Sequence, residues 1–348
     1  MRSLVRLRTL GFRMTAAELR DEVVAALLAL AWDQWSQLGV SAAAPARREE
    51  RAADPEALLL FTLEVGRNDP RLFDEVLDWL ALNERLVSVH RLRNLSVDPT
   101  DRALLEAALE WSAASRGRRR PALEPRALPA RLDPLFPTIP TPTENLDEAF
   151  AQHGLARTQL ESSGKSRAPS LHDPIGFAFR LRRLLGVGVR AEVIRTLLTI
   201  RAPRLSGKVI AASAAFAQRN VREGLSQLVE AGVVDVVEIS DDRYYSVHHT
   251  DWASLLGMPA APDLPFHHDW IPTYRALTRI VRWLSQPGLD DLSPYLRSSQ
   301  ARTLVDTIAA DLNYAGIPVA AYAALGVDFW DEFAEIAVAT IRAARGPR

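Results

Sequence analysis

Residues 205–248 read LSGKVIAASAAFAQRNVREGLSQLVEAGVVDVVEISDDRYYSVH, and this stretch decides the fold. Its middle part predicts an amphipathic helix, because apolar residues recur there at helical spacing, at Val221, Leu225, Leu228 and Val229. Gly232 follows at once, and a glycine can take the left-handed conformation that ends a helix without steric cost. The stretch therefore contains one well-bounded helix.

Two strands are predicted after this helix. The run 233–239 is rich in β-branched residues, residues 243–247 can return beside it, and residues 240–242 have the composition of a turn. A short helix of small residues is predicted before it, over 207–212. The order is thus helix, turn, helix and a two-stranded wing.

The pattern Val-x-x-x-Leu-x-x-Leu-x-x-x-Gly-Val-Val, from Val221 to Val234, resembles the recognition helix and first wing strand of MarR-like and ArsR-like bacterial transcriptional regulators. The resemblance covers about an eighth of the chain. It implies a winged helix-turn-helix, a module that places one helix in the major groove of double-stranded DNA. It also implies a homodimer, since one recognition helix rarely supplies enough specificity.

The polar face of the predicted helix suits DNA. Arginine can pair with guanine, and asparagine or glutamine with adenine, through two hydrogen bonds each. The predicted base-reading residues are Gln218, Arg219, Asn220 and Arg222, and Ser226 on the same face is predicted to belong to the DNA-binding set. Arg201, Arg204, Lys208 and Arg243 are predicted to complete the DNA-binding set, the first three by contacting the phosphate backbone.

Charge supports the helix but not the wing. Residues 171–232 carry ten basic and four acidic side chains, a net of +6 in a chain whose net charge is −1. Residues 235–251 carry five acids and one arginine, and Asp241 and Asp242 at the wing tip would repel phosphate. We therefore expect little contact between the wing and DNA.

A protein-interaction module is the alternative, because the same fold also binds proteins. The arrangement is loosely similar to winged-helix antitoxins that neutralise nucleotidyltransferase-type toxins. The predicted third helix is acidic (Asp74, Glu75, Asp78, Glu84) and favours a protein partner, whereas the basic central region favours DNA. Both functions stay open at this point.

The N-terminal region is predicted to repeat the same order. Thr15 and Glu18 form a capping box, and Asp54 with Pro55 opens a second helix. A third helix over 70–82 and a strand over 86–90 follow, with Asn83 in the left-handed position between them. Leu72, Val76, Trp79 and Asn83 share the offsets of Val221, Leu225, Leu228 and Gly232, which suggests a degenerate second winged helix.

The predicted fold class is mainly α with small β wings, as tandem winged helices followed by a helical region. The predicted domains are an N-terminal helical domain over 15–115, the winged helix over 171–258, and a dimerisation or partner-binding region over 262–348. Residues 116–170 begin with a basic cluster and are rich in proline, which predicts a linker containing a short helix near 144–153.

Composition and motifs favour a cytoplasmic protein that is not an enzyme and needs no cofactor. There is no cysteine, which excludes disulfides and thiolate catalysis, and no apolar run long enough to cross a membrane. Gly164-Lys165-Ser166 lacks the glycine and the leading strand of a phosphate-binding loop. The pairs His248-His249 and His267-His268 offer imidazoles, but adjacent residues seldom converge on one ion, so no metal site is predicted.

Overall fold

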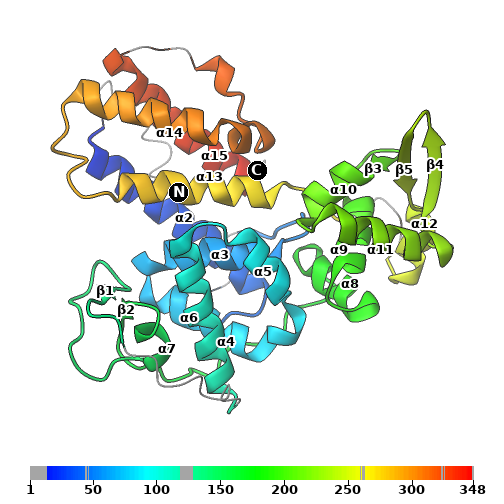
Figure 1. Cartoon of the computed structure of the whole chain (residues 1–348), viewed down its shortest axis with the longest axis horizontal. Coiled ribbons are helices and arrows are strands. Elements are labelled where there is room, and N and C mark those ends of the chain that lie inside the picture. The colour runs from blue at the N-terminus through cyan, green and yellow to red at the C-terminus, as the bar shows by residue number, and fades with distance from the viewer. Residues whose placement is uncertain are drawn as a thin grey trace. The chain divides into compact units, whose positions relative to one another are not determined.

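The computed structural model describes residues 14–43, 45, 47–117, 128–258, 260, 263–322, 324 and 326–346. Residues 118–120 of the predicted basic cluster lie outside these residues. Over these described residues the protein is mainly helical, with two small sheets (Figure 1). None of the described helices combines the length and apolar character needed to cross a membrane.

The chain divides into two compact units. Unit 1 comprises Met1–Ala31, Glu64–Asp69 and Asp269–Arg348, and unit 2 comprises Trp32–Leu63 and Pro70–His268. Each unit therefore draws on segments that are distant in sequence.

Unit 1 is a set of packed helices. Its elements are the first part of α2 (Ala16–Gln37), η1 (Gly66–Asn68), α13 (Trp270–Leu284), α14 (Pro294–Tyr314), η5 (Val319–Ala321), η6 (Gly326–Asp328) and α15 (Phe329–Arg345). The rings of Trp283 and Phe333 lie 5.1 Å apart between α13 and α15. The predicted capping box is confirmed, since Thr15 Oγ1 accepts from the Glu18 N–H at 3.2 Å and Glu18 Oε2 accepts from the Thr15 N–H at 2.9 Å.

Unit 2 begins with a group of helices around two tryptophans. Its first elements are α3 (Pro55–Val65), α4 (Pro70–Asn83), η2 (Glu84–Leu86), α5 (Val89–Leu95) and α6 (Pro99–Ser115). The rings of Trp35 and Trp79 lie 4.8 Å apart, and their indole N–H groups donate to Thr62 Oγ1 and to the Leu38 carbonyl. The predicted Asp54 cap is confirmed, because its Oδ1 accepts from the Ala57 N–H at 3.0 Å.

The prediction of a strand over 86–90 is wrong. Residues 84–86 form the turn η2, and α5 starts at Val89 with Ser88 as its N-cap. Asn83 is not left-handed either, since its φ is −111°. Tertiary contacts override the β-branched composition here, because the Ser88 N–H and the Leu86 carbonyl bind buried charged side chains. A second wing does not form at these residues.

Residues 128–170 pack on the helices before them. The two-residue strands β1 (Asp133–Pro134) and β2 (Leu155–Ala156) pair in parallel, and the short helix α7 (Glu148–Ala151) packs on α6. The predicted short helix near 144–153 is thus confirmed. Leu135, Phe150 and Leu155 are buried, so this segment adds apolar surface to the core of unit 2.

The rest of unit 2 has the predicted order of helix, turn, helix and two strands, which is confirmed. Its elements are η3 (Pro174–Gly176), α8 (Phe177–Leu185), α9 (Val189–Thr199), β3 (Leu205–Ser206), α10 (Gly207–Ala214), α11 (Gln218–Glu230), β4 (Asp235–Ile239), β5 (Asp242–Ser246) and α12 (His249–Leu255). The sheet has the antiparallel order β3-β5-β4, and β3 was not predicted. Gly232 has a φ of +70°, as predicted.

Candidate nucleic-acid interface

The helix α11 is held by close packing on α9. Its buried residues Val221, Leu225 and Leu228 join a core with Val193, Leu197 and Ile210. Gly224 lies where a methyl group would come within 3.1 Å of Val189 Cγ1, so the two helices are in close contact. The preceding α10 ends at Ala214, and the next residue, Ala215, has a φ of 54° that reverses the chain toward α11.

The opposite face of α11 is exposed, as predicted. Gln218, Arg219, Asn220, Arg222 and Ser226 are all exposed. Within the described residues, Arg219 and Arg222 form no ion pair, whereas Ser226 Oγ donates to Glu230 Oε1 at 3.1 Å. The first turn of α11 has no acidic residue, so its N-terminal N–H groups meet no intrahelical carboxylate there. Both guanidinium groups are available to a partner.

The exposed face also carries an acidic residue that the sequence analysis left out of the site. At about 100° per residue, Glu223 falls one turn after Arg219 on the outward side. Glutamate can accept a hydrogen bond from the N4 amino group of cytosine. The spacing of four residues from Arg219 was a sufficient signal for including Glu223 in the site.

The predicted phosphate contacts divide into two groups. Arg204 and Lys208 are exposed beside the start of α10. The guanidinium of Arg201 donates to the Leu264 carbonyl at 2.7 Å and lies 5.1 Å from the centre of the Phe266 ring. Arg201 therefore holds the segment after α12, which reduces its freedom to reach a phosphate.

Arg243 in the wing is bound by its own hairpin. Its Nε donates to Glu238 Oε1 at 2.8 Å, and this hydrogen bond raises the pKa of Arg243. Both side chains are 65% exposed. A phosphate would have to compete with Glu238 for Arg243, beside the acidic tip at Asp241 and Asp242.

The surface charge of this region is smaller than the sequence count suggests. Arg182 and Arg195 are buried with Glu192, and Arg180 is half-buried. Over residues 171–232, seven exposed basic residues remain against three exposed acidic residues, a net charge of +4. The basic residues are Arg183, Arg190, Arg201, Arg204, Lys208, Arg219 and Arg222, and the acidic residues are Asp173, Glu223 and Glu230. The region stays basic after this correction.

The buried charges form a closed ring of alternating sign, here called the charge ring. Its six members are joined by six contacts of 2.5–3.7 Å, in the order Asp54, Arg91, Glu56, Arg182, Glu192, Arg195 and back to Asp54. Burial raises the pKa of Glu192, but the positive charges of Arg195, Arg182 and Arg91 outweigh burial and hold that pKa well below its ordinary value. Glu192 is therefore ionised at neutral pH.

The charge ring connects the first helices of unit 2 to α10. Arg91 lies on α5, and its Nε donates to the Ala214 carbonyl at 2.8 Å, at the last residue of α10. The neighbouring His90 ring lies 6.0 Å from the Phe216 ring, nearly parallel to it. The turn between α10 and α11 is thus held from α5, immediately before the first exposed residue of α11.

The acidic side chains of the α4 region are already bound within the chain. Asp74 pairs with Arg157 at 2.8 Å, and Glu84 pairs with Arg116. Asp78 Oδ2 accepts from the Ser163 and Gly164 N–H groups, and Glu75 Oε2 accepts from Ser163 Oγ. Asp74, Glu75 and Asp78 thus hold residues 157–164, including the start of the Gly-Lys-Ser sequence, which leaves fewer carboxylates for a protein partner.

The histidine pairs lie in separate surroundings. His248 Nε2 lies 3.2 Å from Asp235 Oδ2, and His267 Nδ1 lies 3.4 Å from Thr199 Oγ1. No cluster of three metal-ligating side chains occurs in the part of the chain that the structure describes.

Comparison with known proteins adds no relative from which a role could be transferred. The chain matches no family model, no curated protein and no solved structure.

Proposed function

We propose that residues 171–258 act as a winged helix-turn-helix that binds double-stranded DNA through α11, and that the chain is a transcriptional regulator. The observation that carries the proposal is the exposed face of α11, where two arginines lie among amide side chains and form no ion pair with any residue that the structure describes. The element order and the sheet order β3-β5-β4 support it, because a winged helix has this connectivity.

The chemistry of the face suits the major groove. Arg219 and Arg222 would pair with guanine, Gln218 and Asn220 with adenine, and Glu223 with cytosine. Arg204 and Lys208 would bind phosphates and supply affinity that does not depend on sequence. The wing would lie away from the backbone, since its tip is acidic.

The test is selection of bound duplexes from a random pool, followed by titration of the best duplex. We expect Arg222→Ala and Arg219→Ala each to weaken binding by about 1–3 kcal/mol and to relax the preference at one position. Arg131→Ala is the matched control, because Arg131 is an exposed arginine outside residues 171–258. Absence of binding to any duplex at low salt would refute the proposal.

Oligomeric state is a separate part of this proposal. A regulator with one reading helix per chain gains specificity by binding two half-sites as a homodimer. Light scattering of the full chain, alone and with the selected duplex, would measure it. A palindromic selected site bound by one chain would contradict the dimer.

A protein partner is the second candidate, and the wing favours it. β4 is an edge strand whose apolar side chains Val236, Val237 and Ile239 are 39%, 43% and 45% exposed. An exposed apolar edge beside acidic residues suits pairing with a strand of another protein, such as a toxin that the chain neutralises. Val237→Lys should release a co-purifying partner and leave DNA affinity unchanged.

A further inference from the structure

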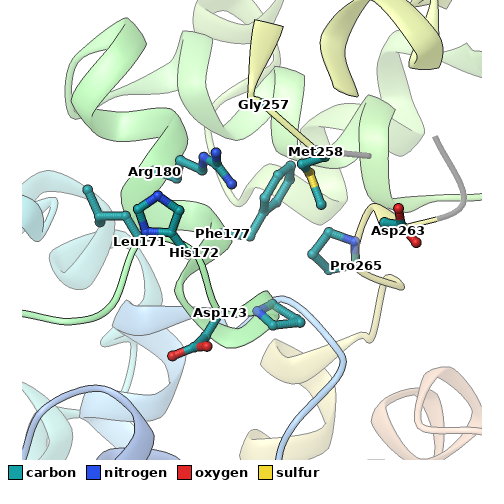
Figure 2. A pocket seen from close by; sticks show the side chains of 10 residues that line it. Leu171, His172, Asp173, Phe177, Arg180, Gly257, Met258, Asp263 and Pro265 are labelled. Carbon is teal, nitrogen blue, oxygen red and sulfur yellow. The ribbon is translucent and has the colours of Figure 1, made fainter. Parts of the chain in front are cut away.

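A cavity of about 320 Å³ lies beside α8 in unit 2. Its lining residues fall within 171–180 and 257–265, so they do not include the exposed face of α11. It is bounded by η3 and the start of α8 on one side and by the segment that follows α12 on the other (Figure 2). Cavities that bind small organic molecules have volumes of about 300–1,000 Å³, so this one suits a molecule with a single small apolar group.

Arg180 is the feature that points to a ligand. It is half-buried, and one of its terminal N–H groups donates to the Leu256 carbonyl. In the described part of unit 2 it forms no ion pair, whereas the buried arginines Arg91, Arg157, Arg182 and Arg195 are all paired with carboxylates. A partly desolvated guanidinium with unused donors favours an anion.

The other lining residues indicate which chemical groups the bound anion carries besides its charge. Phe177, Met258 and Pro265 supply apolar surface, and Figure 2 shows the Arg180 guanidinium between the Phe177 ring and the His172 imidazole. The carboxylate of Asp173 points away from Phe177 in this view, and Asp263 Oδ2 accepts from the Ala260 N–H at 3.0 Å. These two carboxylates disfavour a phosphate dianion, which leaves a monoanion.

We propose that this cavity binds a small monocarboxylic acid with an apolar body, its carboxylate on Arg180 and its body against Phe177, Met258 and Pro265. His172 is placed to donate a second hydrogen bond to the same carboxylate. The site does not depend on DNA binding, because it shares no residue with the exposed face of α11.

Three probes with the same ring test the proposal on the full chain: phenylacetate, phenylacetamide and 2-phenylethylamine. Calorimetric titration should give a dissociation constant on the order of 1 mM for phenylacetate and markedly weaker binding of the amide and the amine. This ranking of the three ligands is measured on the wild-type chain. It therefore tests the proposal even if a substitution in the cavity impairs folding. Stronger binding of the amine, or binding of none of the three, would overturn the proposal.

Variants then locate the site. Arg180→Gln should weaken phenylacetate about tenfold or more, since it removes a charge-assisted hydrogen bond. Arg183→Gln is the matched control on the same helix, where the side chain is exposed, and should leave affinity unchanged. Met258→Trp fills the cavity while keeping the Arg180 side chain in the protein, and should also abolish binding. Equal affinity in wild type and in all three variants would place the ligand elsewhere and reject the site.

Discussion

At the scale of single residues, the charge ring has an energetic consequence that unfolding measurements can detect. Each carboxylate of the ring (Asp54, Glu56 and Glu192) contacts two of its arginines, and each arginine (Arg91, Arg182 and Arg195) contacts two of its carboxylates. Burying one ion without a partner costs several kcal/mol, whereas a closed ring compensates every charge. Removal of one member therefore takes one of two buried partners from each of its neighbours and leaves the ring with an unbalanced charge.

Arg91→Ala should lower the free energy of unfolding by about 3–5 kcal/mol, because Asp54 and Glu56 would each lose a buried partner. Arg93→Ala is the control, since Arg93 lies on the same helix but pairs with Glu106 at the surface. We expect that change to cost about 1 kcal/mol or less. Urea unfolding of both variants measures the difference, and equal costs would show that the ring contributes no more than a surface pair.

The ring also predicts how stability depends on pH. Its arginine neighbours lower the pKa of Glu192 against the effect of burial, so the unfolded chain takes up a proton there at higher pH than the folded chain does. The stabilisation from Glu192 is then complete above the unfolded pKa of about 4.3 and decreases as pH falls below it.

Glu192→Gln should therefore be less stable than wild type at pH 7, and the gap should narrow as the pH is lowered from about 4. Urea midpoints of both proteins at pH 7 and at about pH 3 give the comparison. A gap that stays constant or widens in acid would contradict an ionised Glu192 in the folded chain.

At the scale of elements, the helix α11 combines a buried stripe with an exposed polar face. Its distance from α9 is set by Gly224, where any side chain would meet Val189. The exposed residues keep their positions only while this contact is close. The orientation of the candidate interface thus depends on a residue that is itself buried.

Gly224→Val should destabilise the chain by about 1–3 kcal/mol through overpacking, despite the better helix propensity of valine. Gly232→Asn tests a glycine that is required for its backbone conformation and not for packing, because Gly232 has a φ of +70° and open space around it. Asparagine tolerates that conformation, so we expect a cost of less than about 1 kcal/mol. Thermal unfolding of the two variants distinguishes packing from backbone conformation.

At the scale of the whole molecule, the C-terminal helices share a unit with the start of the chain. The indole N–H of Trp330 donates to the Met14 carbonyl at 2.7 Å, Arg345 donates to the Ala26 carbonyl, and Arg282 pairs with Glu64. Asp290 accepts from the Ala17 N–H at 3.0 Å. Residues 262–348 therefore lack part of their unit when separated from residues 14–69.

Residues 262–348 expressed alone should show no cooperative unfolding transition, since these contacts and the apolar surface of α2 are missing. Co-expression with residues 1–69 should restore a cooperative transition, followed by circular dichroism during heating. An isolated fragment that unfolds cooperatively would show that α13, α14 and α15 form a complete core by themselves.

Helix positions and their caps were determined by the sequence itself. The stripe Val221, Leu225 and Leu228 predicted the exposed face of α11, and the caps at Thr15 and Asp54 form as predicted. Periodicity and capping are local properties, because they depend on residues within about one turn of each other. Gly232 ends α11 for the same reason.

Only the tertiary structure decided which charges reach the surface. Arg182 and Arg195 count as basic residues of the winged-helix region in the sequence, yet they are buried opposite Asp54 and Glu56 from a distant segment. The non-strand backbone at 86–88 follows from the same ring, since the Leu86 carbonyl and the Ser88 N–H bind Arg182 and Glu56 in place of a neighbouring strand. The partner of a charge depends on how distant segments fold together, and this information is absent from local patterns of hydrophobicity.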